Sequence, residues 1–195
     1  MSTWISKALG LCLILSLAAC QINTETFAIG GGARQISVLG DEMLVVAPTG
    51  YCVDKTSLRQ QSDGAVVLIG RCNSTSRLPP AVISVTIGSV ASAGVVADGG
   101  LAMAAFFQTP GGRAMLSRTG QAETVRLRQS GSVNGVFFMH IDEANVGAYW
   151  RAILGISGRL VTVSVQGPEG IELDPKAGQN LLTATIASMR RGNLL

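Results

Sequence analysis

The sequence is poor in the residues and motifs that most often carry enzyme chemistry. It has one histidine, His140, and four cysteines among 195 residues. No Gly-x-Ser-x-Gly motif is present, so the serine nucleophile of the α/β-hydrolases is not indicated. The glycines at 30–32 lack the lysine and the serine or threonine of a P-loop, so they predict no phosphate site. The sequence therefore points to no cofactor.

Positive charge is also scarce and scattered. Fifteen basic and twelve acidic side chains give a formal net charge of +3. Arg126 and Arg128 alternate with apolar residues in a predicted strand, and Arg190 and Arg191 close a predicted helix. No basic block carries interleaved aromatic residues, which excludes the usual pattern of a nucleic-acid-binding surface. We expect no nucleic-acid partner.

Long apolar runs are missing except at the start of the chain. Lys7 is followed by an apolar run from Ala8 to Leu17, which is too short to span a bilayer as a permanent helix. A charged start, a short apolar middle and small residues before a cleavage point are typical of a secretory signal. Residues 1–19 are therefore predicted to be a signal peptide. No later stretch of about 18 apolar residues predicts a transmembrane helix.

The signal ends in Leu17, Ala18, Ala19 and Cys20, which resembles the bacterial lipobox. The resemblance implies a lipoprotein signal peptide, a diacylglyceryl group on the Cys20 sulfur and cleavage after Ala19, usually with acylation of the new amino group. It implies attachment to a membrane through lipid alone. Gln21 favours the outer membrane, facing the periplasm, under the sorting rule of enteric lipoproteins. The alternative is an ordinary cleaved signal with a chance cysteine.

Residues 20–34 are polar and then rich in glycine, which is typical of a flexible tether. The remaining residues, 35–195, have the length of a single domain with a substantial core. We therefore expect a lipidated tether that carries one periplasmic α+β domain.

Two cysteines remain for this domain, because Cys12 lies in the signal and Cys20 is assigned to lipid. An isolated pair, Cys52 and Cys72, most simply forms a disulfide in an oxidising periplasm. The alternatives are a redox pair or half of a metal site. The nineteen residues between the two differ from the Cys-x-x-Cys spacing of such sites.

Apolar alternation bounded by turn residues predicts strands, most of them in hairpin pairs. The expected strands are 36–38, 43–47, 65–69, 81–87, 124–128, 136–141, 149–156 and 159–165. Tyr149 and Trp150 are expected in the core of the sheet, with an exposed aromatic binding edge as the alternative.

Helices are predicted from capping residues and from apolar spacings of three and four. The candidates, with their caps, are 57–61 (Asp54 or Thr56), 100–108 (Asp98), 113–118 (Thr109, followed by Pro110) and a C-terminal helix opened by Asp174 and Pro175 and ended by Gly192. Paired strands with packing helices predict an α+β fold with a mostly antiparallel sheet.

Two further stretches resemble known groups. The run 48–54, followed by an apolar strand and then Gly70, Arg71 and Cys72, is similar to uncharacterised alphaproteobacterial lipoproteins, for which no activity is implied. The run 158–163, a turn at Gly167 and Pro168, and a helix with Leu181, Leu182 and Ile186 are similar to the PsbP-like fold. This resemblance implies an architecture and no catalytic residue.

His140, Asp142 and Glu143 form the one cluster that resembles an acid and base group. In an alternating strand His140 and Asp142 face the same side, close enough to interact. The alternative is a structural histidine at the end of a strand. No metal site is predicted, since one histidine and a bridged cysteine pair leave only carboxylates as ligands.

These observations favour a lipid-anchored cell-envelope protein with a non-enzymatic binding or accessory role and an envelope protein as partner. The alternative is a periplasmic hydrolase or redox enzyme that uses the region of His140 and Asp142. A third class is a carrier of a small ligand, which predicts an apolar cavity.

Overall fold

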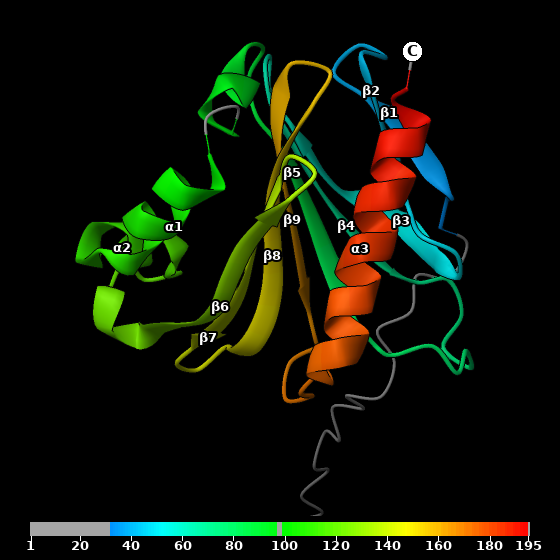
Figure 1. Ribbon diagram of the computed structural model, residues 1–195. Coiled ribbons are helices and arrows are strands. Elements are labelled where there is room, and N and C mark those ends of the chain that lie inside the picture. The colour runs from blue at the N-terminus through cyan, green and yellow to red at the C-terminus, as the bar shows by residue number, and fades with distance from the viewer. Residues whose placement is uncertain (1–31, 97–98, 195) are drawn as a thin grey trace, which may run out of the picture.

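The computed structural model describes residues 32–96 and 99–194 (Figure 1). The strands are β1 (Gln35–Val38), β2 (Met43–Val46), β3 (Tyr51–Gln60), β4 (Ala65–Arg71), β5 (Val82–Ile87), β6 (Val125–Val133), β7 (Val136–Glu143), β8 (Gly147–Ile156) and β9 (Arg159–Gln166). The helices are α1 (Gly100–Gln108), α2 (Pro110–Leu116) and α3 (Pro175–Gly192), with 3₁₀ turns η1 (Ser92–Val96) and η2 (Ala122–Thr124).

A seven-stranded antiparallel sheet has the order β3-β4-β5-β9-β8-β7-β6, and β1 and β2 form a separate hairpin. Most neighbours in the large sheet follow one another along the chain. The exception is β5 beside β9, where Ile83 pairs with Val165 across a long connection. With its helices this sheet gives the α+β fold that the sequence predicts.

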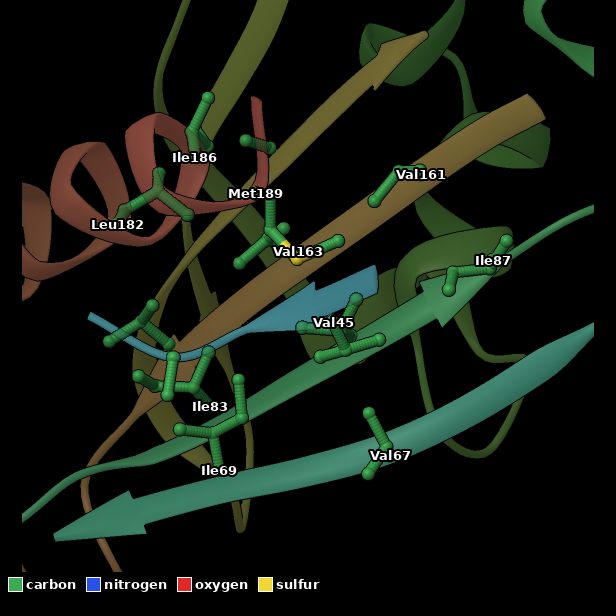
Figure 2. Packing of buried hydrophobic residues seen from close by; sticks show 14 of the residues in the cluster. Val45, Val67, Ile69, Ile83, Ile87, Val161, Val163, Leu182, Ile186 and Met189 are labelled. Atoms are coloured by element: carbon green, nitrogen blue, oxygen red, sulfur yellow. The ribbon is translucent and has the colours of Figure 1, made fainter. Parts of the chain in front are cut away.

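One face of the sheet is covered by α3 and by the β1–β2 hairpin (Figure 1). Leu182, Ile186 and Met189 of α3 pack toward Val163 of β9, and Val45 of β2 joins the same apolar cluster (Figure 2). Burying a side chain of this size contributes roughly 1.5–3 kcal/mol. This layer is therefore the main core, and we call this side of the sheet the α3 face.

Helix α3 begins where the sequence predicts. The Asp174 carboxylate accepts a hydrogen bond from the Ala177 amide at 2.8 Å, and Pro175 occupies the first turn. Gly178 lies against β8, where an added Cβ would be 2.9 Å from the indole ring of Trp150. A glycine at this position therefore lets the first turns of the helix approach the sheet closely.

The opposite face is covered by α1 and α2 beside β6 and β7 (Figure 1). Phe107 of α1 stacks on Phe137 of β7, with ring centroids 5.8 Å apart. Thr109 caps α2 by accepting a hydrogen bond from the Gly112 amide. The predicted cap at Thr109 and the proline in the first turn are confirmed. The helix begins at Pro110, three residues before the predicted range of 113–118, and ends at Leu116.

The helix predicted over residues 57–61 is wrong, because this segment belongs almost entirely to β3. The pairing of β3 with β4 shifts register after Asp54. The polar residues that suggested a helix cap shape this irregularity, since the Asp54 carboxylate accepts hydrogen bonds from the amide and hydroxyl of Thr56. Ser57 accepts a cross-strand bond from the Leu68 amide at 2.8 Å. Hydrogen bonds of the kind that would cap a helix therefore support a β-bulge here, because β4 provides a strand for this segment to pair with.

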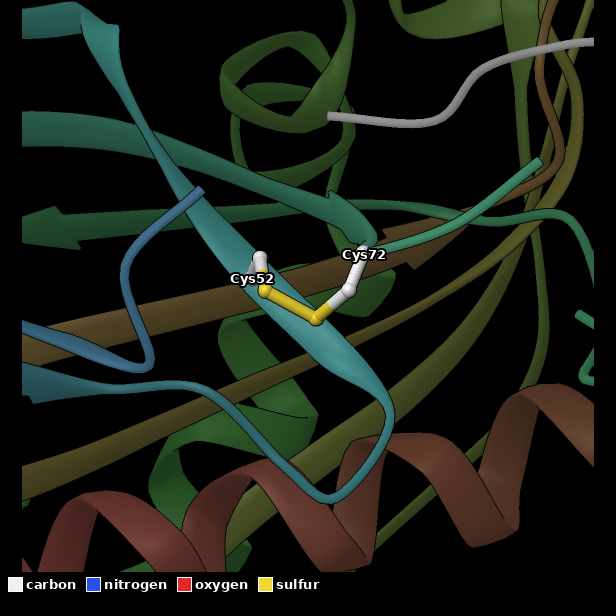
Figure 3. Close-up of a disulfide and its surroundings, with 2 residues drawn as sticks. All are labelled: Cys52 and Cys72. Atoms are coloured by element: carbon white, nitrogen blue, oxygen red, sulfur yellow. A yellow bond between two sulfur atoms is a disulfide. The ribbon is translucent and has the colours of Figure 1, made fainter. Parts of the chain in front are cut away.

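The predicted disulfide is confirmed, with Cys52 of β3 bonded to Cys72 just after β4 (Figure 3). The register explains the pairing, since Cys52 lies opposite Gly70 and Cys72 follows two residues later. The Cys72 amide also donates a hydrogen bond to the Gly50 carbonyl at 3.1 Å. The bond therefore closes the open end of the β3–β4 hairpin.

The signal peptide, Cys20 and the proposed cap Asp98 lie outside the described residues. The predicted tether is described only from residue 32, and the Val53 amide already donates to the Ala33 carbonyl at 2.7 Å. Backbone pairing thus includes a residue two positions before the expected domain start at Gln35. Within the described ranges, no helix has the length and apolarity needed to cross a membrane.

Replacing both Cys52 and Cys72 with serine should lower the free energy of unfolding by about 3 kcal/mol, because a loop of about 20 residues no longer restricts the unfolded chain. Urea denaturation of the oxidised protein and of the double variant measures the difference. A reductant should reproduce the loss in the parent protein and leave the double variant unchanged. Equal urea midpoints for the parent with and without reductant would contradict this expectation.

Candidate functional site

The three residues predicted as an acid and base cluster are divided by the alternation of β7. His140 and Asp142 lie on the same side of the strand, as predicted, and this side is the α3 face, whereas the neighbouring Glu143 is buried on the opposite side. The Glu143 carboxylate accepts hydrogen bonds from the Arg118 amide at 2.6 Å and from the Tyr149 hydroxyl at 3.3 Å. Glu143 therefore fastens the segment after α2 to the sheet and is separated from the other two residues.

Tyr149 is part of this buried contact. Its hydroxyl also lies 3.3 Å from the Leu116 carbonyl, which accepts from it. Burial raises the pKa of Tyr149 to about 12, with Glu143 adding to the rise and Arg151 opposing it. The phenol therefore stays protonated and acts as a donor. Tyr149 and Trp150 are each 4% exposed, so the prediction that they belong to the core is confirmed.

His140 is stacked on Trp150, with ring centroids 4.6 Å apart and an angle of 11° between the planes. Burial lowers the pKa of His140, the Arg128 guanidinium lowers it further, and the Asp142 carboxylate opposes both. Asp142 itself forms an ion pair with Arg128 of β6. The described residues provide His140 with no side-chain hydrogen bond. At neutral pH this side chain is therefore a neutral ring on an aromatic surface.

A groove opens beside this aromatic pair, between α3 and strands β6 and β7, with a volume of about 330 Å³. We call it the α3 groove. Helix α3 packs over β8, β9 and β2 and leaves the β6–β7 end of its face uncovered (Figure 1). The residues that line the groove are Val133, Asn134, Val136, Phe138, Trp150, Gln179, Leu182, Thr183, Ile186, Ala187 and Arg190.

The aromatic side of the groove is held in place by its surroundings. The Trp150 indole N–H donates a hydrogen bond to the Pro175 carbonyl at 2.8 Å, which fixes the ring against the start of α3. Phe138 lies 6.3 Å from Trp150 between ring centroids. Its ring covers Gly131 of β6, where an added Cβ would be 2.6 Å from the ring. The two rings therefore form a preformed apolar surface.

One charged side chain lines the α3 groove. Arg190, near the end of α3, donates a hydrogen bond across the groove to the Asn134 carbonyl in the β6–β7 turn at 2.8 Å. In the described part of the chain Arg190 forms no ion pair, and no carboxylate lines the groove. The groove thus combines an apolar body with a positive end.

A second surface is exposed and apolar on the opposite side of the sheet. We call it the α1 surface, and it belongs to the excursion between β5 and η2. Leu101 is 90% exposed although Phe107, on the same helix, is buried against the sheet. The α1 surface comprises Leu101 and Phe106 of α1 and Met115 of α2, which packs beside α1. Val90 and Val95 are also exposed, but they lie before and within η1.

The α3 groove could not be located from the sequence. Phe138 reads as one apolar residue in a predicted strand, and Leu182 and Ile186 as the packing side of a helix. A carrier with an apolar cavity was the third functional class that the sequence left open, but no residue pattern indicated where such a cavity would lie. Within the described ranges, no group of three potential ligands among His, Cys, Asp and Glu could hold a metal ion.

Replacing Arg128 with glutamine should raise the pKa of His140, because a positive charge that disfavours the imidazolium is removed. Asp142→Asn should lower this pKa further, because it removes the opposing carboxylate. The protein has a single histidine, so NMR titration of its ring protons measures both shifts. A shift in the reverse direction for either variant would contradict the assigned causes.

The lowered pKa also gives a sign to the pH dependence of stability. The ordinary pKa of 6.5 applies to the unfolded chain, so below this pH the unfolded state binds more protons than the folded state. The contribution of His140 to the free energy of unfolding is therefore fully present above pH 6.5. It is lost as the pH falls through the lower pKa of the folded state. Arg128→Gln should reduce this loss.

Comparisons with known proteins leave the family open. No family model matches the sequence, and no curated protein matches it. Among solved structures, a mutant of the protein Mog1 is similar to this chain with a TM-score of 0.46 and 11% sequence identity, and the match covers 81% of this chain and 93% of that one. The assignment to the α+β class rests on the sheet and helices themselves.

Proposed function

We propose that the protein is a lipid-anchored cell-envelope protein, attached through Cys20 to the outer membrane and facing the periplasm. Its role is non-enzymatic, as a binding or accessory protein for an envelope protein partner. The ending of the signal, from Leu17 to Cys20, supports the anchor. The Cys52–Cys72 disulfide supports an oxidising compartment, since such bonds are rare in the cytosol.

The observation that carries the binding role is the α1 surface. An apolar side chain that is 90% exposed, as Leu101 is, gains nothing from the fold that displays it. The 20 residues from 89 to 108 contain one charged residue, Asp98. Large exposed apolar side chains on neighbouring helices, in a segment with little charge, are typical of protein–protein contacts. A partner with a complementary apolar surface would bury these side chains.

Cys20→Ala should release the protein from membranes, because the sulfur that receives the diacylglyceryl group is lost. Fractionation of cells into soluble and membrane pools, followed by immunoblotting, measures this. Cys12→Ala is the matched control, since that cysteine lies within the signal, and it should leave the protein in the membrane pool. Cys20→Ala protein that still sediments with membranes would refute the anchor.

Leu101→Glu should abolish capture of the partner, because a charge placed within an apolar contact is costly to bury. The measurement is a crosslinked pull-down from membranes of cells that produce the lipidated protein. Leu194→Glu is the matched control, since Leu194 is 75% exposed near the C-terminus and away from the α1 surface. Both variants change only exposed side chains, so each should fold.

A partner band that is lost with Leu101→Glu and kept with Leu194→Glu is the expected result. Equal recovery of the same partner with both variants would rule out the α1 surface as its binding site. Loss with both variants would show that any added negative charge interferes, and would count against the assignment as well.

A further inference from the structure

The geometry points to the α3 groove as a binding site for a single-chain amphiphile with an anionic head group. The inference deepens the proposed binding role and rests on it, but it concerns a different surface from the one assigned to the protein partner. It is argued from the size of the groove, the nature of its lining and the position of one cation.

The size of the groove fits a small ligand. Its volume of about 330 Å³ lies at the lower end of the range of about 300–1,000 Å³ that is usual for small-molecule sites. A protein interface instead needs about 800 Å² of surface from each partner. A single hydrocarbon chain can enter such a space between a helix and a sheet without unfolding either.

The lining of the α3 groove favours a ligand with an apolar chain. Phe138 and Trp150 supply fixed aromatic rings on the sheet side, and Leu182 and Ile186 supply branched aliphatic groups on the helix side. Val133 of β6 is 55% exposed at the rim, so its burial by a ligand removes apolar surface from water. Each methylene group buried in such a site strengthens binding about fourfold.

The positive charge of Arg190 at one end of the α3 groove favours a ligand with an anionic head group. Arg190 spans the groove and uses a guanidinium N–H for the Asn134 carbonyl, and the planar guanidinium group carries five N–H donors. Carboxylates and phosphates match this fork with two parallel bonds. Favourable interaction with the helix dipole accounts for basic residues at the end of α3, but Arg191 occupies the same turn without lining the groove. The placement of Arg190 is therefore specific to the groove.

The protein carries its own reporter for this test. Its two tryptophans are Trp4 and Trp150, and the proposed cleavage after Ala19 removes Trp4. The mature protein, like an uncleaved chain with Trp4→Phe, therefore has a single tryptophan, and that residue lines the groove. Titrations follow its fluorescence with dodecanoate, dodecyl phosphate and dodecyltrimethylammonium, each below the concentration at which it forms micelles. The three probes share one chain length and differ in head group.

The two anions should bind at least about tenfold more tightly than the cation, because the head group meets a guanidinium that forms no ion pair with the described residues. Arg190→Gln should reduce this preference to about threefold or less, whereas Arg191→Gln should keep it. The ratio of affinities within one variant is unaffected by a small loss of stability. Whichever anion binds more tightly identifies the head group as a carboxylate or a phosphate.

A second pair of variants tests the location. Thr183→Phe places a ring in the groove from an exposed position on α3 and should abolish the fluorescence response to both anions. Ala184→Phe adds the same ring to the other flank of the helix, which borders a separate depression, and should leave the response intact. Thermal unfolding of each variant checks that the fold is retained.

Three outcomes would overturn the inference. Binding of the cation as tight as that of the anions removes the role of Arg190. An unchanged response in Thr183→Phe places the ligand elsewhere. No response to any probe, with loss of the crosslinked partner in Thr183→Phe, assigns the groove to an apolar segment of that partner. None of these results affects the tests of Cys20 or Leu101, so the proposed function stands or fails separately.

Discussion

The packing of α3 on the centre of the sheet is the interaction on which the rest of the structure depends. The helix and the β1–β2 hairpin together bury the valine and isoleucine rows of β4, β5 and β9. The sheet depends on this cover, since a sheet with a bare apolar face is not stable in water. The position of α3 also decides where the sheet is left open, and the α3 groove is the result.

The two sides of the sheet use the same kind of helix contact for different purposes. On the α3 face, the helix is amphipathic: its apolar side packs on the sheet, and part of that side, at Leu182 and Ile186, also lines the opening beside it. On the opposite side, α1 is apolar nearly all round and is anchored mainly by Phe107. A helix that is apolar on its outer side leaves binding capacity toward a partner. The two proposed binding surfaces therefore have different origins: the α3 groove is a part of the sheet that its helix leaves uncovered, and the α1 surface is a side of a helix that nothing in the described chain covers.

The sequence predicted the elements better than it predicted their arrangement. Periodicity of two and the turn residues located the β1–β2, β6–β7 and β8–β9 hairpins, and Asp174 with Pro175 located α3, because these signals act within a few residues. The helix predicted over residues 57–61 was wrong because its capping signal is local, whereas the strand that pairs with this segment, β4, comes later in the chain. The α3 groove could not be predicted for a related reason, since Phe138 and Arg190 are brought together only by long-range packing. The alternation that placed His140 beside Asp142 was the one site prediction that needed no tertiary information.

The start of α1 has a consequence for how copies of the protein behave near one another. Gly100 is so close to β6 that an added Cβ would be 2.1 Å from the Ser132 side chain, and β6 is the last strand of the sheet. An uncovered last strand offers unpaired backbone groups to a strand of another molecule. Helix α1 thus starts against a side chain of the last strand, and a partner that pulled α1 away from Ser132 would leave this part of β6 with less cover beside its open edge.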